Sequence, residues 1–227
     1  MNFNKKITTE TIAIALGSIF ITHKLYCKYK RYSNKHKIYI NGDIDDNMYE
    51  HFMNQYSKIN IEDDIEIHVK SHGGLLNCAY MISRVIQNHK AKTTSFIHEY
   101  AKSSGTVIAL SCSKIMMTHT ACISKIDPQI DDSNLYNGLA LCESRIKDEI
   151  NEPSQKLAEY YKFEYLQIYA ENIVKTNREM ILKILNKTYE TDQVENIVRR
   201  LFDSQKAHGH LFFYEDVVDI LNIELIN

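Results

Sequence analysis

The tetrapeptide SHGG at residues 71–74 and the heptapeptide YAKSSGT at residues 100–106 decide the fold of this chain. Each follows a run rich in β-branched residues, IEIHVK at 65–70 and KTTSFIHE at 92–99, and each precedes apolar residues at helical spacing. A strand, a glycine-containing turn and a helix therefore occur twice in succession. This alternation predicts an α/β fold with a mainly parallel sheet.

The flanking sequence adds further elements of both kinds. The tripeptide DPQ at 127–129 marks a sharp break between a region of alternating elements and a region that is almost entirely helical in pattern. The predicted strands are KIYINGDID at 37–45, which ends in a turn, and KIMMTHTACIS at 114–124; the predicted helices are 45–58, 75–89, most of 140–200, and a last helix with a short strand in 212–225.

Both loops have features that a catalytic site requires. Paired glycines after a strand allow a tight turn and leave backbone N–H groups accessible to a ligand. A serine between a strand and a helix can point its hydroxyl outward, beside the helix N-terminus that favours developing negative charge. Taken singly, the first loop is equally an ordinary turn, and Ser103 is equally a helix N-cap.

The ordered set of motifs is more specific than either loop. It consists of Gly73-Gly74, the segment AKSSGT at 101–106, IAL at 108–110 and DPQ at 127–129. This set resembles the serine dehydrogenase proteinase family, a branch of the ClpP/crotonase superfamily related to signal peptide peptidase A, over about residues 38–225. The resemblance implies repeated ββα units with a mainly parallel sheet and a helical C-terminal part. It also implies a serine-type endopeptidase, which is a hydrolase.

The resemblance assigns roles to the residues of the two loops. Ser103 is implied as the nucleophile, because in the superfamily the reactive serine precedes a variable residue and a glycine. The N–H groups of Gly74 and Ser104 are implied as the oxyanion hole, and Gly73 as the neighbour that shapes it. Two residues depart from the family pattern: Lys102 stands where a small or apolar residue is usual, and His72 where proline is frequent.

The general base is less well determined than the nucleophile. A serine hydroxyl needs a base, and relatives use either a Ser-His-Asp triad or a Ser-Lys dyad. The segment SKIDPQIDD at 124–132 contains no histidine, which favours a lysine. Lys147 is the preferred candidate and Lys156 the second. The remaining candidates are Lys125, His208 and His210, and a histidine in that tail is also interpreted as ordering the C-terminal helix.

Composition excludes several functional classes. The chain has 227 residues, 44% of them hydrophobic, and a formal net charge of -2, which fits one globular domain and does not favour binding to nucleic acid. No metal-ligand set, dinucleotide loop or phosphate-binding loop occurs, so we predict no metal, no cofactor and no dependence on ATP. The five cysteines lack a CxxC pair and are interpreted as reduced thiols.

The N-terminal segment, residues 1–36, is separable from the predicted protease domain at 37–227. Its apolar run, extended to 7–25, approaches the roughly 20 residues that cross a bilayer, and a basic stretch follows it. We interpret the run as a membrane anchor with the domain facing the cytosol. The alternatives are an interfacial helix and a soluble amphipathic helix packed on the domain, which would then be cytoplasmic.

Three functions compete. The first is a serine peptidase that acts on proteins or peptides. The second is a catalytically inactive ClpP-like scaffold protein, and the third a crotonase-like acyl-CoA enzyme. The third has the least support, because the chain has no basic cluster suited to the phosphates of coenzyme A. By resemblance to relatives that form rings or stacks, we also expect a homo-oligomer.

Overall fold

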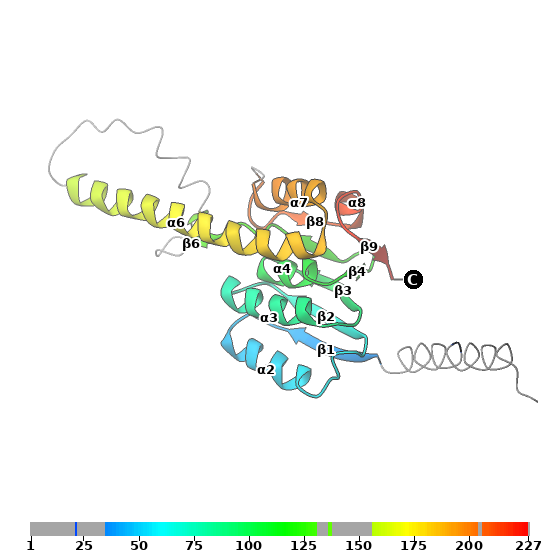
Figure 1. Ribbon diagram of the computed structural model, residues 1–227. Helices are drawn as coiled ribbons and strands as arrows, with labels where there is room; N and C mark the ends of the chain where they lie inside the picture. The colour runs from blue at the N-terminus through cyan, green and yellow to red at the C-terminus, as the bar shows by residue number, and fades with distance from the viewer. Residues whose placement is uncertain (1–20, 22–34, 131–135, 138–155, 204–205, 227) are drawn as a thin grey trace, which may run out of the picture.

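The computed structural model describes residues 35–130, 136–137, 156–203 and 206–226, together with Ile21 (Figure 1). Strands and helices alternate in its first half, and helices dominate its second half. The elements are β1 (His36–Asn41), α2 (Asp46–Tyr56), β2 (Ile65–Ser71), α3 (Leu76–Asn88), β3 (Thr93–Ala101), α4 (Ser104–Leu110), β4 (Lys114–Met117), β5 (Cys122–Ser124), β6 (Gln129–Ile130), β7 (Tyr136–Asn137), α6 (Lys156–Thr188), α7 (Thr191–Ile197), the π-helix η1 (Val198–Phe202), β8 (Leu211–Phe212), α8 (Tyr214–Val217) and β9 (Ile223–Leu225).

A seven-stranded sheet forms the centre of the molecule. Its strands follow the order β1-β2-β3-β4-β9, and all four of these pairings are parallel. Strand β5 pairs in parallel with the end of β3, and β8 adds to β5 as the antiparallel strand. The prediction of a mainly parallel α/β sheet is therefore confirmed.

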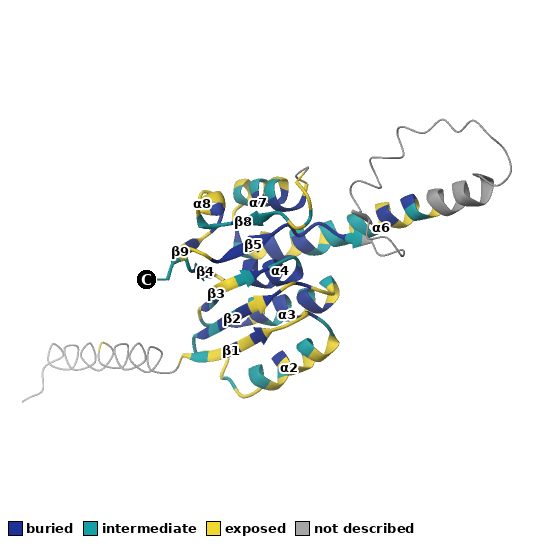
Figure 2. Ribbon diagram, turned by 180° about the vertical axis from the view of Figure 1, so that it is seen from behind, coloured by how far each residue is buried: buried dark blue, intermediate teal, exposed yellow. Residues whose placement is uncertain are grey.

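Helices α2 and α4 contact the sheet, α3 packs between them, and α6 lies against α3 and α4 (Figures 1 and 2). In β2, Ile65, Ile67 and Val69 are buried, whereas the alternating His68 is only partly covered. This period of two is what a pleated strand imposes on its side chains. On the less covered face, the ring of His68 stacks against Tyr39 of the neighbouring strand, with 5.0 Å between their centroids.

The single strand predicted at 114–124 is wrong: the structure divides it into β4 and β5. Strand β3 changes partner along its length, so that Thr94–Ile97 pair with β4 and Tyr100–Ala101 pair with β5. A turn in which the Ala121 N–H donates to the Thr118 carbonyl (3.1 Å) separates the two strands. The division brings β5 to the end of β3, next to Ser103.

Helix α6 is the longest element, with 33 residues. At 1.5 Å per residue it measures about 50 Å, and its N-terminal half extends beyond the sheet (Figure 1). Its C-terminal end is held to α3, where the Gln87 amide donates to the Ile184 carbonyl (2.7 Å) and to the Thr188 hydroxyl (3.0 Å). Of the helical pattern predicted over 140–200, residues 140–155 lie outside the described residues. The predicted C-terminal helix and strand are confirmed as α8 and β9.

The apolar run at 7–25 also lies outside the described residues, except for Ile21. In the part of the chain that the structure describes, none of the helices combines the length and the apolar character needed to cross a membrane.

Candidate active site

Ser103 lies between the end of β3 and the start of α4 and has an unusual backbone conformation. Its φ is 48° and its ψ is −120°, and it is the one non-glycine residue with positive φ among those described. Such a conformation costs of the order of 1–3 kcal/mol and persists only where surrounding contacts hold it. Here the Ser103 N–H donates to the Ser124 Oγ (2.9 Å). Although Ser103 is the N-cap of α4, its side chain makes no capping hydrogen bond.

The structure distinguishes Ser103 from its neighbour Ser104. Ser103 is half-buried, so its hydroxyl is accessible. Ser104 is only 2% exposed, and its Oγ lies in the interior without a hydrogen-bond partner among the described residues. A buried hydroxyl cannot meet a polypeptide substrate. Ser103 is therefore the serine of this loop that a substrate can reach.

The diglycine turn contacts this serine directly. Gly73 has a φ of 112°, and a methyl group added to it would lie 2.7 Å from the Cβ and 3.3 Å from the Oγ of Ser103. Gly74 has a φ of 141°, and its added methyl group would lie 2.3 Å from the carbonyl oxygen of Ile44. Both positions thus combine a conformation that L residues rarely adopt with a close approach. The structure brings the two sequence motifs into one site.

The N–H groups around Ser103 are used unequally. The Gly73 N–H donates to the Ser71 Oγ at 3.0 Å. The N–H groups of Gly74 and Ser104 have no acceptor among the described residues. N–H groups that have no acceptor among the described residues are available to stabilise an oxyanion.

A second layer of contacts holds the two loops together. The Thr106 hydroxyl donates to the Ala101 carbonyl (2.6 Å) and accepts from the Ser124 N–H (3.2 Å). A methyl group at Gly105 would lie 3.2 Å from the Cβ of Ser71, so α4 packs closely on the end of β2. The ends of β2, β3 and β5 and the start of α4 therefore support Ser103 as one unit.

The two residues that depart from the family pattern lie at the edge of this unit. The His72 ring stacks on Tyr100, with 4.4 Å between centroids and 28° between planes. The Lys102 Nζ lies 5.2 Å from the centre of the same Tyr100 ring, within the range of a cation–π contact. His72 and Lys102 thus build a small aromatic and basic cluster next to Ser103.

Of the lysines predicted as the base, only Lys125 has a described side chain. Lys147 lies outside the described residues. Lys156 is the first residue of α6, and its side chain is not described. Lys125 directly follows β5 and is 1% exposed; its Nζ donates to the Lys206 carbonyl (2.9 Å) and lies 3.5 Å from the Asp127 Oδ2.

The two candidate histidines have different surroundings. The Nδ1 of His208 lies 3.0 Å from the Oδ1 of the fully buried Asp127. The Nε2 of His210 lies 2.8 Å from the Lys206 Nζ, and its ring meets the edge of Phe212. Among the described residues no hydrogen bond joins either histidine to the Ser103 hydroxyl.

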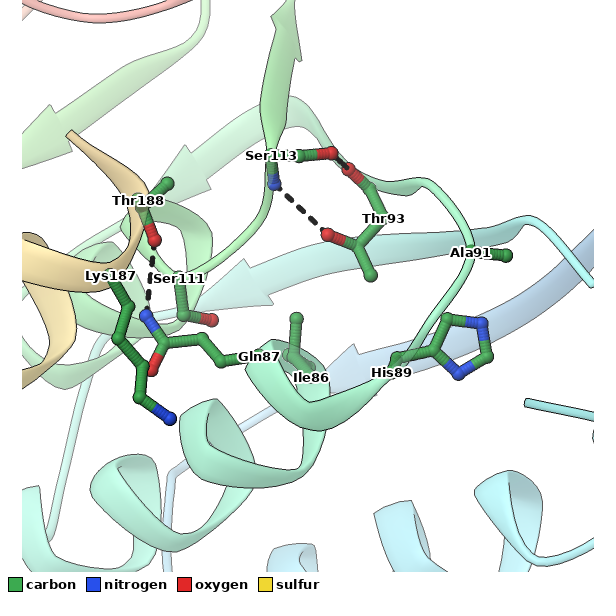
Figure 3. A pocket seen from close by; sticks show the side chains of 9 residues that line it. All are labelled: Ile86, Gln87, His89, Ala91, Thr93, Ser111, Ser113, Lys187 and Thr188. Atoms are coloured by element: carbon green, nitrogen blue, oxygen red, sulfur yellow. Dashed lines mark hydrogen bonds between the residues drawn. The ribbon is translucent and has the colours of Figure 1, made fainter. Parts of the chain in front are cut away.

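A separate hollow of about 210 Å³ lies far from Ser103. Figure 3 shows its lining, in which Gln87 reaches Thr188 and Thr93 meets Ser113. Thr93 is the first residue of β3, whereas Ser103 follows the last, and nine strand residues span roughly 25–30 Å. The lining residues do not include a residue of either loop, so this hollow is not the candidate active site.

Within the described ranges, no group of three or more His, Cys, Asp or Glu residues could hold a metal ion.

Comparison with known families identifies the fold and the class of protein. A family model described as the ClpP-like SDH-type serine proteinase matches residues 37–223. The chain belongs to this family. The membership supports a serine peptidase. It also confirms the resemblance to the serine dehydrogenase proteinase family that the sequence motifs indicated.

Relatives of the chain include two curated proteins and a solved structure. The uncharacterized proteins MJ1495 and MJ0137 of Methanocaldococcus jannaschii are 26% and 22% identical to it over 64% and 69% of the chain. The chain spans about half the length of these two relatives, 47% and 51%. A serine-to-alanine mutant of the membrane-bound stomatin-specific protease 1510-N matches with a TM-score of 0.53 and 18% identity, over 85% of this chain and 79% of the other. This similarity shows the ClpP-like fold.

Two supporting residues of the candidate site were missed by sequence reasoning. Ser124 holds the Ser103 N–H from another strand, and no local pattern distinguishes it from other serines. Asp127 belongs to the DPQ motif, which marks it in the sequence, but its contact with His208 joins residues 81 positions apart and leaves no local signal.

Proposed function

We propose that this chain is a serine peptidase that hydrolyses peptide bonds through an acyl-enzyme on Ser103, without ATP. The single observation that carries the proposal is the placement of Ser103: it has a positive φ, is accessible and packs against Gly73. The N–H groups of the adjoining residues Gly74 and Ser104 have no acceptor among the described residues. Strain at a residue that is not glycine is typical of functional sites, because an ordinary cap would not need it. Membership in a serine proteinase family agrees with this chemistry.

The geometry suggests the course of the reaction. The Ser103 oxygen attacks the carbonyl carbon of a peptide bond while the base takes the hydroxyl proton. The tetrahedral oxyanion accepts hydrogen bonds from the Gly74 and Ser104 N–H groups, and loss of one such donor costs about 3–4 kcal/mol in the transition state. The base returns the proton to the leaving amine, and an ester remains on Ser103. A water molecule, deprotonated by the same base, then releases the acid and regenerates the serine.

We propose Lys147 as the base. The proposal rests on the place of this lysine in the sequence, after the predicted strands and before the long helix, as in the Ser-Lys relatives. A lysine acts as a base only where desolvation keeps it neutral. The surroundings of Lys125 argue for a structural role instead, since its Nζ is engaged by a carbonyl and lies beside a carboxylate. Lys156 remains the second lysine candidate.

Three further expectations complete the proposal. The substrate is a protein or a peptide, which membership in a serine proteinase family supports. The apolar run at 7–25, with basic residues after it, supports association with a membrane and a domain that faces the cytosol. Relatives that assemble into rings or stacks support a homo-oligomer. Size-exclusion chromatography with light scattering tests the last expectation, which a monomer mass would contradict.

Covalent labelling tests the peptidase proposal. Wild-type protein is incubated with a fluorophosphonate, and the intact mass is measured beside Ser103→Ala and the neighbouring control Ser104→Ala. We expect one adduct on the wild type and on S104A, and none on S103A. An adduct that persists in S103A would identify another nucleophile. No adduct on folded wild-type protein would instead favour the non-catalytic scaffold.

The same assay tests the base. Lys147→Ala is expected to abolish the adduct, whereas the matched variant Lys156→Ala is expected to retain it. Labelling of K147A at the wild-type rate would contradict the role of Lys147.

A further inference from the structure

The segment that follows β5 runs beside the C-terminal tail beyond the two paired residues of β8. Ile123 and Ser124 pair with Phe212 and Leu211 in antiparallel register. Continuing the same register by three residues on each strand places Asp127 opposite His208. The contact between the Asp127 Oδ1 and the His208 Nδ1, at 3.0 Å, lies at this position.

The contact satisfies a buried charge. The Asp127 side chain is fully buried, and its second oxygen lies 3.5 Å from the Nζ of the equally buried Lys125. The Lys125 Nζ in turn donates to the Lys206 carbonyl at 2.9 Å. Residues 125 and 127 are thus tied to residues 206 and 208 of the tail. A buried ion pair that loses one partner strongly destabilises its surroundings, because the other charge is left uncompensated.

This cluster adjoins the residue that supports the nucleophile. Ser124, next to Lys125, accepts the Ser103 N–H at 2.9 Å. The Ser124 hydroxyl donates to the Lys125 carbonyl at 3.2 Å, so its direction depends on the position of residue 125. A shift of the segment 124–127 would therefore change the orientation of Ser103, whose strained conformation needs this support.

We propose that His208 is a positioning residue of the site, which acts through Asp127 to hold the segment 124–127 and with it the backbone of Ser103. This inference rests on the proposed function of Ser103. His208 is 27% exposed in its side chain and directs its Nδ1 to Asp127. Three residues of extended chain, about 10 Å, separate Asp127 from Ser124. His208 therefore acts at a distance, and the tail that carries it completes the site.

Four variants test the proposal. His208→Asn keeps an amide nitrogen near the position of Nδ1 and so can still donate to Asp127. His208→Gln has its amide near the position of Nε2, and His208→Leu has no donor. His210→Leu is the control, because His210 lies two residues away and contacts Lys206 and Phe212 instead. Circular dichroism establishes that each variant is folded, and the Gln variant replaces the Leu variant if the latter is not.

The first readout is the rate constant of fluorophosphonate labelling per folded protein. We expect H208L and H208Q to react about 10–100-fold more slowly, because small misplacements of a reacting group have effects of this size. H208N and H210L are expected within threefold of the wild type. Wild-type rates in H208L would overturn the proposal. Equal losses in H208N and H208L would also overturn it, since they would mean that the imidazole itself transfers a proton.

The second readout does not depend on activity. Hydrogen–deuterium exchange is followed in the peptides that cover 100–106 and 120–128. We expect faster exchange in H208L and H208Q, but not in H208N or H210L. Unchanged exchange in H208L would overturn the positioning role even if the wild type fails to label. Absence of labelling with the expected exchange pattern would instead refute the peptidase function alone.

Discussion

Replacement of Gly73 by alanine tests the contact on which the site depends. The added Cβ would lie 2.7 Å from the Ser103 Cβ, whereas carbon atoms prefer about 3.5–4.0 Å. The diglycine turn and the serine loop must then separate by about 1 Å, and misplacement of this size can lower a rate about 100-fold. Because φ is 112° at this position, alanine is also expected to lower the free energy of unfolding by about 1–3 kcal/mol.

Gly42 offers a control that isolates the contact from the strain. Its φ is 119°, close to that of Gly73, but a methyl group added there meets no atom within 4 Å. Gly42→Ala should therefore lose similar stability and keep the labelling rate, while Gly73→Ala should lose both. Urea unfolding measures the first effect, and the fluorophosphonate rate constant per folded protein measures the second. Labelling of G73A at the rate of G42A would refute the inference that close packing of Gly73 on Ser103 orders the site.

Three further predictions concern other parts of the chain. Ser124→Ala removes the acceptor of the Ser103 N–H; it is expected to lower the free energy of unfolding by about 1–3 kcal/mol and to slow labelling, and wild-type values in both assays would contradict this. Burial raises the pKa of the Cys112 thiol to about 12, so Cys112 should resist iodoacetamide in the native protein at pH 8; rapid alkylation, read by peptide mass spectrometry, would argue against its burial. A hydrogen bond from Arg200 lowers the pKa of Asp219, so the stability from this pair is present above the unfolded pKa of about 3.9 and is lost as the pH falls through the lower folded value. Because the pair is exposed, Asp219→Asn should cost less than about 1 kcal/mol at pH 7, and the cost should shrink as the pH falls below about 3.9; a cost that does not change as the pH falls would contradict an electrostatic origin.

The sequence predicted the elements of the sheet well wherever a short window carries the information. Alternation in IEIHVK predicted β2, because a pleated strand buries every second side chain on one face. The same reasoning failed for 114–124, which is continuous in pattern but divided between β4 and β5. The division arises because β3 changes its partner, and a change of partner leaves no mark in the residues of the strand that is divided.

The candidate site divides in the same way. Gly73, Gly74 and Ser103 could be selected from sequence, since glycine pairs and a serine between a strand and a helix have local meanings that the ordered motifs reinforce. Their contact, and the choice of Ser103 over Ser104 on grounds of burial, required the structure. The base Lys147 stays a prediction, as do the membrane anchor at 7–25 and the homo-oligomer.

What the sequence determined by itself is the class of fold, the family and the two loops, because these depend on residue patterns within one element and the turn that follows it. Only the tertiary structure decided that Ser124 holds Ser103 and that His208 meets Asp127 across 81 residues of chain. The physical reason is that the partners of a buried carboxylate come from segments that are distant in sequence and adjacent only in the folded chain. Sheet register and burial, which no single stretch of sequence encodes, select which partners it finds.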